Sequence, residues 1–422
     1  MKNLIILGAG TGGTMVANRM SRTLPSGWTI TVVDPAKKHL YQPGLLFLPF
    51  GARDEAKLER PRQETISPRV LWVRDGVERV ETGEKKIILT RGTILPYDLL
   101  VIATGCQPHP EETAGLLGAH WRDTVHDFYT LEGALALRSK LETFPGGRLV
   151  VNIVEMPIKC PVAPIELIFL ADEYFTRRGI RDRVELVFTT PLDGCFTKPV
   201  AAAALRHLLD EKGIEVDPLF NASEVDGDAR VLRSWDGREQ AYDLLVTIPT
   251  HRGAAFVGAS GLGNELDFIP TERHTLLAKG HDDIFVLGDA TDLPSSKAGS
   301  VAHFQSEVVV ENLLRTIHGQ SLEAGFDGHA NCFIESGFGK ALLIDFNYDV
   351  EPLPGRYPLP WLGPMKLLGE SRINHWGKLG FRPLYWNALL PGHPLPVPNH
   401  MSMLGKHQPK NMEGDSHARA RL

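Results

Sequence analysis

The stretch that decides the fold lies at the start of the chain and reads Leu4-Ile5-Ile6-Leu7-Gly8-Ala9-Gly10-Thr11-Gly12-Gly13. Its four apolar residues predict a short buried strand, and Gly8, Gly10 and Gly13 match the pattern G-x-G-x-x-G. In this pattern the first glycine permits a tight turn, the second lets the backbone approach a pyrophosphate, and the third lets helix and strand pack closely. A helical pattern follows to about residue 24, so the helix N-terminus would face the phosphates. The segment predicts a dinucleotide-binding unit.

A second strand supports this prediction. Residues 29–33 alternate Thr with Ile and Val, and Asp34 follows them directly. An acid at this position accepts a hydrogen bond from a ribose 2′-hydroxyl. It would also repel a 2′-phosphate, so we expect Asp34 to disfavour NADP.

Composition narrows the class of protein. The chain has 422 residues, of which 43% are hydrophobic and 23% charged, as in ordinary globular proteins of two or three domains. A net charge of −6 gives no basic excess, so no nucleic-acid partner is expected. No run of 18 apolar residues predicts a membrane span, and the first apolar run is too short for a signal peptide. Four cysteines are too few for a secreted disulfide framework, so we expect them to serve chemistry.

Two later strands carry the first resemblance. One ends in Ala103-Thr104-Gly105 and the other in Gly288-Asp289. Together with the glycine motif, in this order, they resemble the flavoproteins of the pyridine nucleotide-disulfide reductase superfamily. The resemblance implies an α/β fold with two Rossmann-like dinucleotide-binding domains of three ββα layers. It also implies FAD, bound at these motifs, with Asp289 holding the ribityl chain.

The second dinucleotide-binding site departs from the superfamily pattern. An expected strand at 148–154 is followed by residues 155–166, which contain three prolines and no glycine. Proline rings and Cβ atoms block a pyrophosphate, and proline has no N–H to offer it. An expected helix at about 164–178 and a strand at about 184–190 still complete the βαβ unit. We therefore predict that NAD(P)H is not the main substrate.

The same segment carries a second, narrower resemblance. Residues 159–166 (KCPVAPIE) resemble the K-C-x-x-A-P-x-E segment of sulfide:quinone oxidoreductases, and residues 328–339 resemble that family's later G-x-x-x-C-x-x-x-x-G-x-G segment. The resemblance implies that Cys160 and Cys332 meet beside the flavin, bridged by sulfur. Hydrosulfide would attack this bridge, and the electrons would pass through FAD to a membrane quinone. Glu166 would handle protons.

Residue chemistry adds expectations at this site. Cys160 at a helix start, beside Lys159, is expected to gain thiolate character. Lys297 is expected near the isoalloxazine ring, where its charge would stabilise reduced flavin. Many family members carry a third cysteine within the region corresponding to 123–130, where this chain has none and where His126 could assist protonation. FAD is therefore expected to be non-covalent.

The sequence gives less support for a chemical role of the remaining two cysteines. Cys106 and Cys195 are interpreted as bystanders, although either could replace the missing third cysteine. No metal site is predicted.

The C-terminal part predicts location more than chemistry. Arg372, His375, Lys378 and Arg382 share one face of an expected helix. Ile373, Trp376, Gly380 and Leu384 share another. Basic and aromatic residues at this spacing favour an interfacial membrane helix, and an ordinary amphipathic helix packed on the core is the alternative. We expect a peripheral protein on the cytoplasmic face of the membrane, and the resemblance leaves room for a homo-oligomer. Candidate quinone residues are Phe338, Phe346 and Tyr348.

These expectations divide the chain into four parts. An FAD-binding domain comes from residues 1–115 and 270–325, and a second Rossmann-like domain, without the NAD(P)H glycine motif, comes from residues 116–269. A C-terminal quinone- and membrane-associating region covers 326–404. Residues 405–422 have the composition of a disordered tail.

Two other functions stay open. One is an NADH:quinone or other FAD-dependent oxidoreductase of the pyridine nucleotide-disulfide type. The other is a non-catalytic flavin protein that carries or senses polysulfide. Reduction of the flavin by sulfide, and its reoxidation by quinone, would distinguish these readings.

Overall fold

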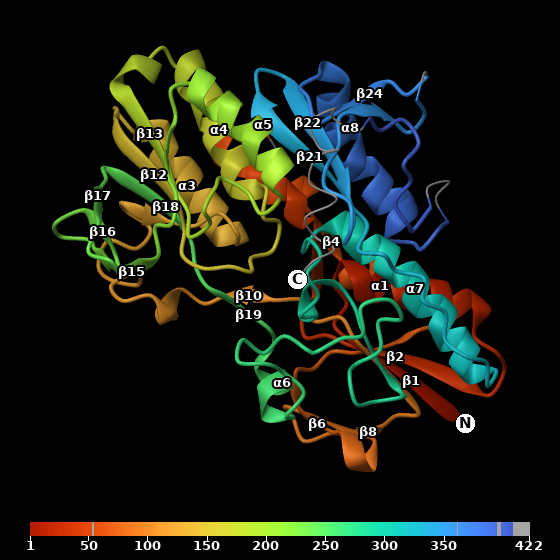
Figure 1. Ribbon diagram of the computed structural model, residues 1–422. Helices are drawn as coiled ribbons and strands as arrows, with labels where there is room; N and C mark the ends of the chain where they lie inside the picture. Colours follow the sequence, from red (N-terminus) through yellow and green to blue (C-terminus); the bar gives the residue numbers. More distant parts are fainter. Residues whose placement is uncertain (53–54, 361, 395–397, 408–422) are drawn as a thin grey trace, which may run out of the picture.

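The computed structural model describes residues 1–52, 55–360, 362–394 and 398–407 (Figure 1). The chain begins as its glycine motif predicts, with β1 (Lys2–Leu7), α1 (Thr11–Thr23) and β2 (Trp28–Val33). These belong to a parallel sheet of order β20-β9-β1-β2-β5. Its other strands are β5 (Leu71–Val73), β9 (Leu99–Ile102) and β20 (Ile284–Val286).

Alternating side chains of β1 bury both faces of this sheet. Leu4 and Ile6 pack with helices α1 and α7 (Gly299–Ile317), whereas Ile5 and Leu7 join a separate core on the other face. That second core is covered by α6 (Ala255–Ala259) and by an antiparallel sheet of β6 (Val77–Glu81), β7 (Lys86–Leu89) and β8 (Ile94–Pro96). The first domain therefore has the expected three layers.

A second parallel sheet repeats the arrangement, with the order β11-β18-β12-β13-β14. Its strands are β11 (Val125–His126), β12 (Gly147–Ile153), β13 (Val184–Thr189), β14 (Glu215–Asp217) and β18 (Leu244–Ile248). One face carries α3 (Leu131–Thr143), α4 (Ala163–Arg177) and α5 (Pro199–Glu211), and the other carries β15 (Ala222–Asp226), β16 (Val231–Ser234) and β17 (Glu239–Ala241). The helix and strand predicted after the glycine-free loop match α4 and β13 within one residue. The short strands β10 (Gln107–Pro108) and β19 (His251–Arg252) pair between the two domains.

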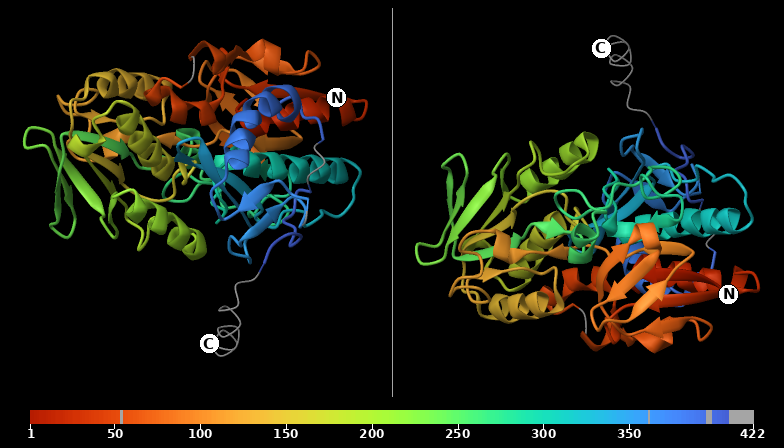
Figure 2. Two further views of the ribbon diagram at one scale, coloured as in Figure 1. Left: turned by 90° about the horizontal axis from the view of Figure 1, so that it is seen from above. Right: turned by 90° about the horizontal axis from the view of Figure 1, so that it is seen from below.

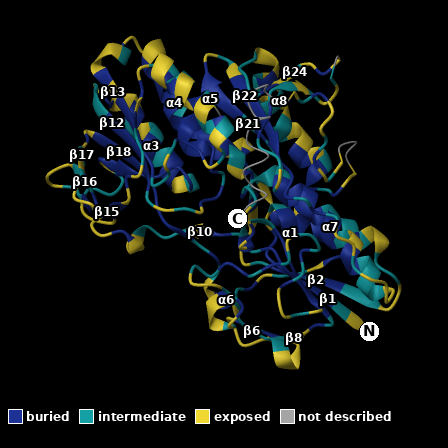
Figure 3. Ribbon diagram, viewed as in Figure 1, coloured by how far each residue is buried: buried dark blue, intermediate teal, exposed yellow. Residues whose placement is uncertain are grey.

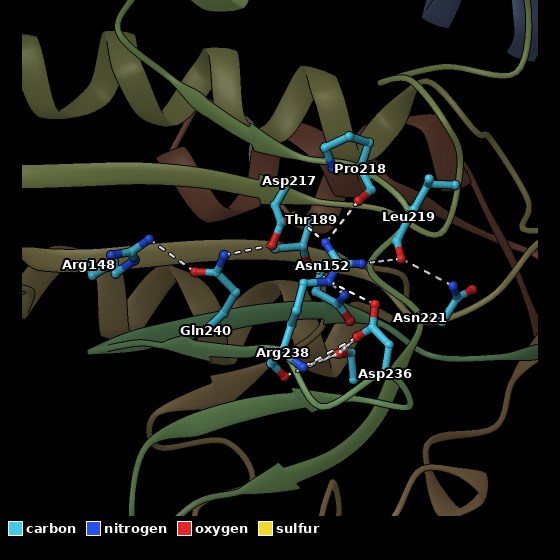
Figure 4. Close-up of polar contacts among 11 residues, drawn as sticks. Arg148, Asn152, Thr189, Asp217, Pro218, Leu219, Asn221, Asp236, Arg238 and Gln240 are labelled. Carbon is cyan, nitrogen blue, oxygen red and sulfur yellow. Dashed lines mark hydrogen bonds and ion pairs between the residues drawn. The ribbon is translucent and has the colours of Figure 1, made fainter.

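Polar side chains tie the small antiparallel sheet to the edge of this second sheet (Figure 4). Arg238 donates to Asp217 at 2.7 Å, and the Gln240 amide donates to the other oxygen of Asp217 at 2.7 Å. Arg148 donates to the Gln240 side-chain oxygen at 3.0 Å. These bonds are made within the protein, so the carboxylate at the end of β14 serves the fold.

A third sheet lies beside helices of both domains. Its order is β21-β22-β24-β23, formed by β21 (Ala330–Gly337), β22 (Lys340–Phe346), β23 (Gly355–Tyr357) and β24 (Met365–Leu367). Strand β21 packs against α4 of the second domain and α7 of the first (Figures 1 and 2). Helix α8 (Arg372–Leu384) then crosses β22 and continues into a π-helical turn, η7 (Tyr385–Leu389). Within the described residues, no helix is long and apolar enough to cross a membrane.

Residues 405–407, which the sequence assigns to a disordered tail, make specific contacts with the rest of the protein. The Gly405 carbonyl accepts a hydrogen bond from the Arg356 N–H at 2.8 Å, and Lys406 pairs with Asp345 at 2.5 Å with both side chains 1% exposed. The prediction of disorder was therefore wrong for residues 405–407, because composition does not reveal a buried ion pair to a distant strand. Residues 408–422 lie outside the described part of the chain.

Candidate functional site

A cavity lies where the loops after β1, β9 and β20 meet the start of α4 and the C-terminal segment. Its wall contains most of the residues predicted for the cofactor and the chemistry. These are Gly10, Ala103, Thr104, Gly105, Cys160, Glu166, Gly288, Asp289 and Lys297. The ends of β1, β9 and β20 that lead to it are buried, and Figure 3 shows exposed residues on the outer helix faces and loops. The carboxyl ends of parallel strands are where such folds bind ligands.

The glycine loop is shaped as a dinucleotide cradle. A Cβ on Gly8 (φ +91°) would come within 2.6 Å of the Ala103 carbonyl oxygen, and one on Gly13 within 1.9 Å of the Gly8 carbonyl oxygen. A Cβ on Gly10 would meet no atom within 4 Å, which leaves open space beside this backbone. Gly8 and Gly13 therefore allow the turn and the close helix, and Gly10 offers its backbone to the cavity.

Asp34 supports the loop directly. Its carboxylate accepts a hydrogen bond from the Ala9 N–H at 2.7 Å and from the Ala36 N–H at 2.8 Å. Arg62 pairs with it at 3.2 Å. Asp34 lies outside the cavity wall, so in this structure it holds the loop that faces the cavity.

The opposite wall offers polar groups to a ligand. The Thr104 hydroxyl is buried and has no hydrogen-bond partner among the described residues. Burial raises the pKa of Asp289. Burial lowers the pKa of Lys297, whose ammonium donates to the carbonyl oxygens of Asp289 at 2.9 Å and Thr291 at 2.7 Å. An unpaired hydroxyl beside an open glycine loop fits a polar cofactor such as FAD.

Cys160 sits in a strained turn at the other end of the cavity, three residues before α4. Its φ is +49°, which non-glycine residues seldom adopt. Three hydrogen bonds hold it there: its N–H donates to the Lys297 carbonyl oxygen at 2.6 Å, and its own carbonyl accepts from the Ala163 N–H at 2.9 Å and the Tyr129 hydroxyl at 3.1 Å. Such overdetermined strain is typical of functional positions.

Cys332 on β21 lies near Glu166 and Lys378, and both Cys160 and Cys332 are free thiols in this structure. Burial, and then the Glu166 carboxylate, raise the pKa of Cys160 to about 12 and that of Cys332 to about 11. A charge on Cys332 raises the pKa of Cys160 further, so the two thiols lie within electrostatic range of each other. The expected thiolate character of Cys160 was wrong for this state, because burial outweighs the helix dipole and Lys159 is not among the groups that shift its pKa.

Glu166 joins the helix of the second domain to the C-terminal sheet. It is 1% exposed, it pairs closely with Lys378, and its carboxylate accepts a hydrogen bond from the Glu335 N–H at 2.7 Å. Lys378 also donates to the Phe333 carbonyl oxygen at 3.2 Å and lines the cavity. Lys378 was assigned to a membrane-facing surface by its helical spacing. In the structure Lys378 points inward, because it pairs with the buried Glu166 carboxylate.

A second acid continues this arrangement toward the surface. Burial raises the pKa of Glu335, whose carboxylate accepts from His375 Nδ1 at 2.9 Å. The His375 side chain is 22% exposed, and Glu335 is 1% exposed. Glu166, Lys378, Glu335 and His375 therefore form one cluster of ionisable groups between the cavity and the half-buried His375. His375, like Lys378, does not belong to an exposed basic face, which corrects the prediction for α8.

The apolar face predicted for α8 is exposed. Ile373 is 40% exposed, Trp376 65% and Leu384 39%, and Leu379 (39%) lies in the same stripe. Gly380 is exposed beside them.

The other sequence candidates are more dispersed. Cys106 lines the cavity as a buried thiol, and burial raises its pKa to about 12. Cys195 is buried elsewhere, where its thiol donates to the Ala202 carbonyl oxygen at 3.3 Å. His126 bonds the Asp123 carbonyl oxygen at 2.9 Å and is not part of the cavity wall.

The three aromatic residues suggested for quinone do not lie together. Phe338 is 42% exposed in the β21–β22 turn, and Phe346 is buried at the far end of β22 under Lys198. The Tyr348 hydroxyl donates to the Arg273 carbonyl oxygen at 3.2 Å. None of them lines the cavity, because sequence proximity on a hairpin does not place side chains at one end of it.

Known proteins resemble this chain over most of its length. Residues 2–152 match the model of the pyridine nucleotide-disulphide oxidoreductase family. A sulfide:quinone oxidoreductase of Dictyostelium discoideum mitochondria is 27% identical over 400 residues, covering 92% of this chain and 86% of that protein. Its mouse counterpart is 25% identical over 397 residues, covering 92% of this chain and 86% of its own length. The chain resembles sulfide:quinone oxidoreductases along nearly its whole length.

A solved structure shows the same fold. The sulfide:quinone oxidoreductase of Aquifex aeolicus superposes with a TM-score of 0.76 at 18% identity, covering 93% of this chain and 92% of that one. Together with the family match, this makes the protein an oxidoreductase of the FAD-binding flavoprotein fold. Sulfide:quinone oxidoreductases are thus the proteins against which its cavity should be interpreted.

Proposed function

We propose that this protein oxidises sulfide at the Cys160–Cys332 pair and passes the electrons through FAD to a membrane quinone. The observation that carries the proposal is the convergence of Cys160, Glu166 and Lys378 in the cavity wall, with the Cys332 thiol close enough to Glu166 and Lys378 for their charges to shift its pKa. They come from the start of α4, from β21 and from α8, so three distant segments build one site. The similarity to sulfide:quinone oxidoreductases supplies the substrate class.

The loop after β12 argues against NADH as the main electron donor. It has no glycine between residues 155 and 162, and it folds into the turn that holds Cys160. Strand β13 ends at Thr189 and Thr190 follows it, so no carboxylate stands directly after the strand, where a ribose would be recognised. In this proposal the turn that holds Cys160 stands where a nucleotide-binding loop would follow β12.

The cysteines carry the sulfur chemistry. Hydrosulfide attacks one sulfur of an oxidised Cys160–Cys332 bridge, which forms a persulfide and releases the other cysteine as a thiolate. The persulfide and the thiolate then join into a trisulfide bridge, losing two electrons and one proton. FAD, when bound, supplies a two-electron acceptor that quinone can reoxidise. Each turn adds one sulfur to the bridge. A further hydrosulfide then opens the lengthened bridge, and the cysteine thiolate it releases attacks the sulfur of the other cysteine, which re-forms the Cys160–Cys332 disulfide and displaces the chain as polysulfide.

Buried charges manage the protons. Glu166 lies beside both thiols and can accept the proton released when the persulfide joins the thiolate. Lys378 pairs with that carboxylate in a buried place. Glu335 and His375 link it to the surface, which gives protons a path between the cavity and solvent.

The quinone and the membrane are tied to α8 in this proposal. An exposed stripe of Ile373, Trp376, Leu379 and Leu384 fits the interfacial layer of a bilayer, where tryptophan is favoured. The inward side of the same helix carries Lys378 to the cavity. A helix resting on the membrane would thus place the cavity near a bilayer quinone. We propose a peripheral attachment on the cytoplasmic face, with non-covalent FAD.

Anaerobic addition of sulfide tests the proposal. The flavin absorbance should bleach with stoichiometric sulfide and return when a ubiquinone analogue is added. Cys160→Ser and Cys332→Ser should abolish the bleaching, while Cys195→Ser should bleach normally because Cys195 lies outside the cavity. Absence of bleaching in the wild type would refute the function, and bleaching without quinone turnover would favour a polysulfide carrier.

A further inference from the structure

The C-terminal segment reaches back to the glycine loop through one tyrosine. Tyr385 begins the π-helical turn η7, is 1% exposed and lines the cavity. Its hydroxyl lies 2.8 Å from Thr11 Oγ1 and 2.6 Å from His39 Nε2. Thr11 is the first residue of α1 and also lines the cavity. Single π-helical turns occur often at functional sites.

Neighbouring contacts fix the direction of these hydrogen bonds. The Ala9 carbonyl oxygen already accepts from Arg62 and, at 2.9 Å, from the Thr14 hydroxyl, which uses both of its lone pairs. His39 Nδ1 lies 3.2 Å both from the Ala9 carbonyl oxygen and from the Arg62 guanidinium, which can only donate. Because that carbonyl oxygen already has two donors and Arg62 cannot accept, we assign His39 Nδ1 as the acceptor from Arg62 and place the ring proton on Nε2.

That tautomer sets the direction of the remaining hydrogen bonds. His39 Nε2–H donates to the Tyr385 oxygen, so the Tyr385 hydroxyl proton must go to Thr11 Oγ1. Burial lowers the pKa of His39 to about 3 and raises that of Tyr385, so both groups stay neutral at ordinary pH. Thr11 accepts from Tyr385 and keeps its own proton for another partner. Thr11 lines the cavity beside Gly10, so this proton can be offered to a ligand there.

We propose that Tyr385 is a positioning residue for FAD: it orients the Thr11 hydroxyl so that its proton is offered to the cofactor diphosphate. The C-terminal segment thereby becomes part of the FAD site. Asn18 on α1 strengthens the junction, because its amide donates to the Leu390 carbonyl oxygen at 2.8 Å. This inference depends on FAD binding and is independent of the sulfide reaction proposed above.

Titration of apoprotein with FAD, followed by flavin fluorescence, tests the role of Tyr385. Tyr385→Phe keeps the ring and removes the hydroxyl, and it should raise the FAD dissociation constant roughly tenfold, the usual effect of losing one hydrogen-bond partner in a buried site. Tyr242→Phe is the matched control, because that buried hydroxyl has no hydrogen-bond partner among the described residues. Its affinity for FAD should equal that of the wild type.

A double-mutant cycle separates positioning from general packing. Thr11→Val should weaken FAD binding, and Tyr385→Phe should add nothing in the Thr11→Val background, because Tyr385 acts through Thr11. Thr11→Ser, which keeps the hydroxyl, should bind FAD nearly as the wild type does. Equal losses in both backgrounds, or wild-type affinity of Tyr385→Phe, would overturn the inference. Circular dichroism of each apoprotein checks that it is folded.

Discussion

Lys378→Met tests whether the pair beneath the cysteines is held together as the structure describes. The side chains of Lys378 and Glu166 are 13% and 1% exposed, so solvent screens their pairing little. Methionine keeps the length of the side chain and removes the ammonium, which leaves a buried carboxylate without its partner. Breaking a buried pair in this way costs about 3–5 kcal/mol. Because native proteins are stable by only about 5–15 kcal/mol, the loss should be large.

Urea unfolding of the holoenzyme, followed by circular dichroism and by flavin fluorescence, measures this loss. Lys340→Met is the matched control, since Lys340 pairs with Glu370 at 3.2 Å while 47% exposed, and such pairs contribute about 0–1 kcal/mol. Glu166→Gln should also destabilise, but less, because Glu335 remains near Lys378. The double variant should cost less than the sum of the two single losses. Equal effects of Lys378→Met and Lys340→Met would refute the account of the buried pair.

Three further predictions follow from the thiols, the exposed helix and the glycine-free loop. In the reduced enzyme, the pKa values of about 12 for Cys160 and about 11 for Cys332 should slow their reaction with iodoacetamide at pH 7 by about a hundredfold or more relative to the unfolded chain. The reaction rates should rise with pH up to about 11. Rates that do not depend on pH would contradict the raised pKa values. Trp376→Ser should weaken co-sedimentation with anionic lipid vesicles several-fold, while Trp235→Ser should not, although Trp235 on the second domain is the more exposed tryptophan; equal binding of all three proteins would exclude α8 as the membrane contact. NADH at micromolar concentration should leave the flavin oxidised in a stopped-flow experiment, and rapid reduction would restore NADH as a substrate.

The raised thiol pKa values also set a direction for stability. A thiol whose pKa is higher in the folded than in the unfolded chain stabilises the fold fully below the unfolded value, about 9. This contribution is lost as pH rises from about 9 toward 12. The reduced enzyme should therefore lose stability in mild alkali sooner than the enzyme with a bridged cysteine pair.

The parts of the fold that local patterns encode could be predicted from the sequence. The glycine motif, the strand after it and the βαβ unit around residues 148–190 depend on spacing within about 40 residues, and the structure has them within one or two positions. The cavity could be predicted for the same reason, since strand ends of a parallel sheet meet at one edge.

The long-range pairings could not be predicted in this way. Lys378 and Glu166 are 212 residues apart, and helical spacing alone placed the lysine on the wrong face of α8. Tyr385 lies 374 residues from Thr11, with no local signal that it would enter the cofactor cavity. The prediction of a reactive Cys160 thiolate was wrong for a different reason. The helix start that would lower the thiol pKa is visible in the sequence, whereas the burial that raises the pKa is not.

Peptide mapping by mass spectrometry under non-reducing conditions tests the central claim most directly. The enzyme would be given sulfide and a limiting amount of quinone, quenched with acid and digested. The account predicts a cross-linked species that joins the Cys160 and Cys332 peptides through one or more added sulfur atoms, absent from Cys332→Ser. Sulfur found instead between Cys160 and Cys106, or free thiols at both Cys160 and Cys332 after turnover, would contradict it.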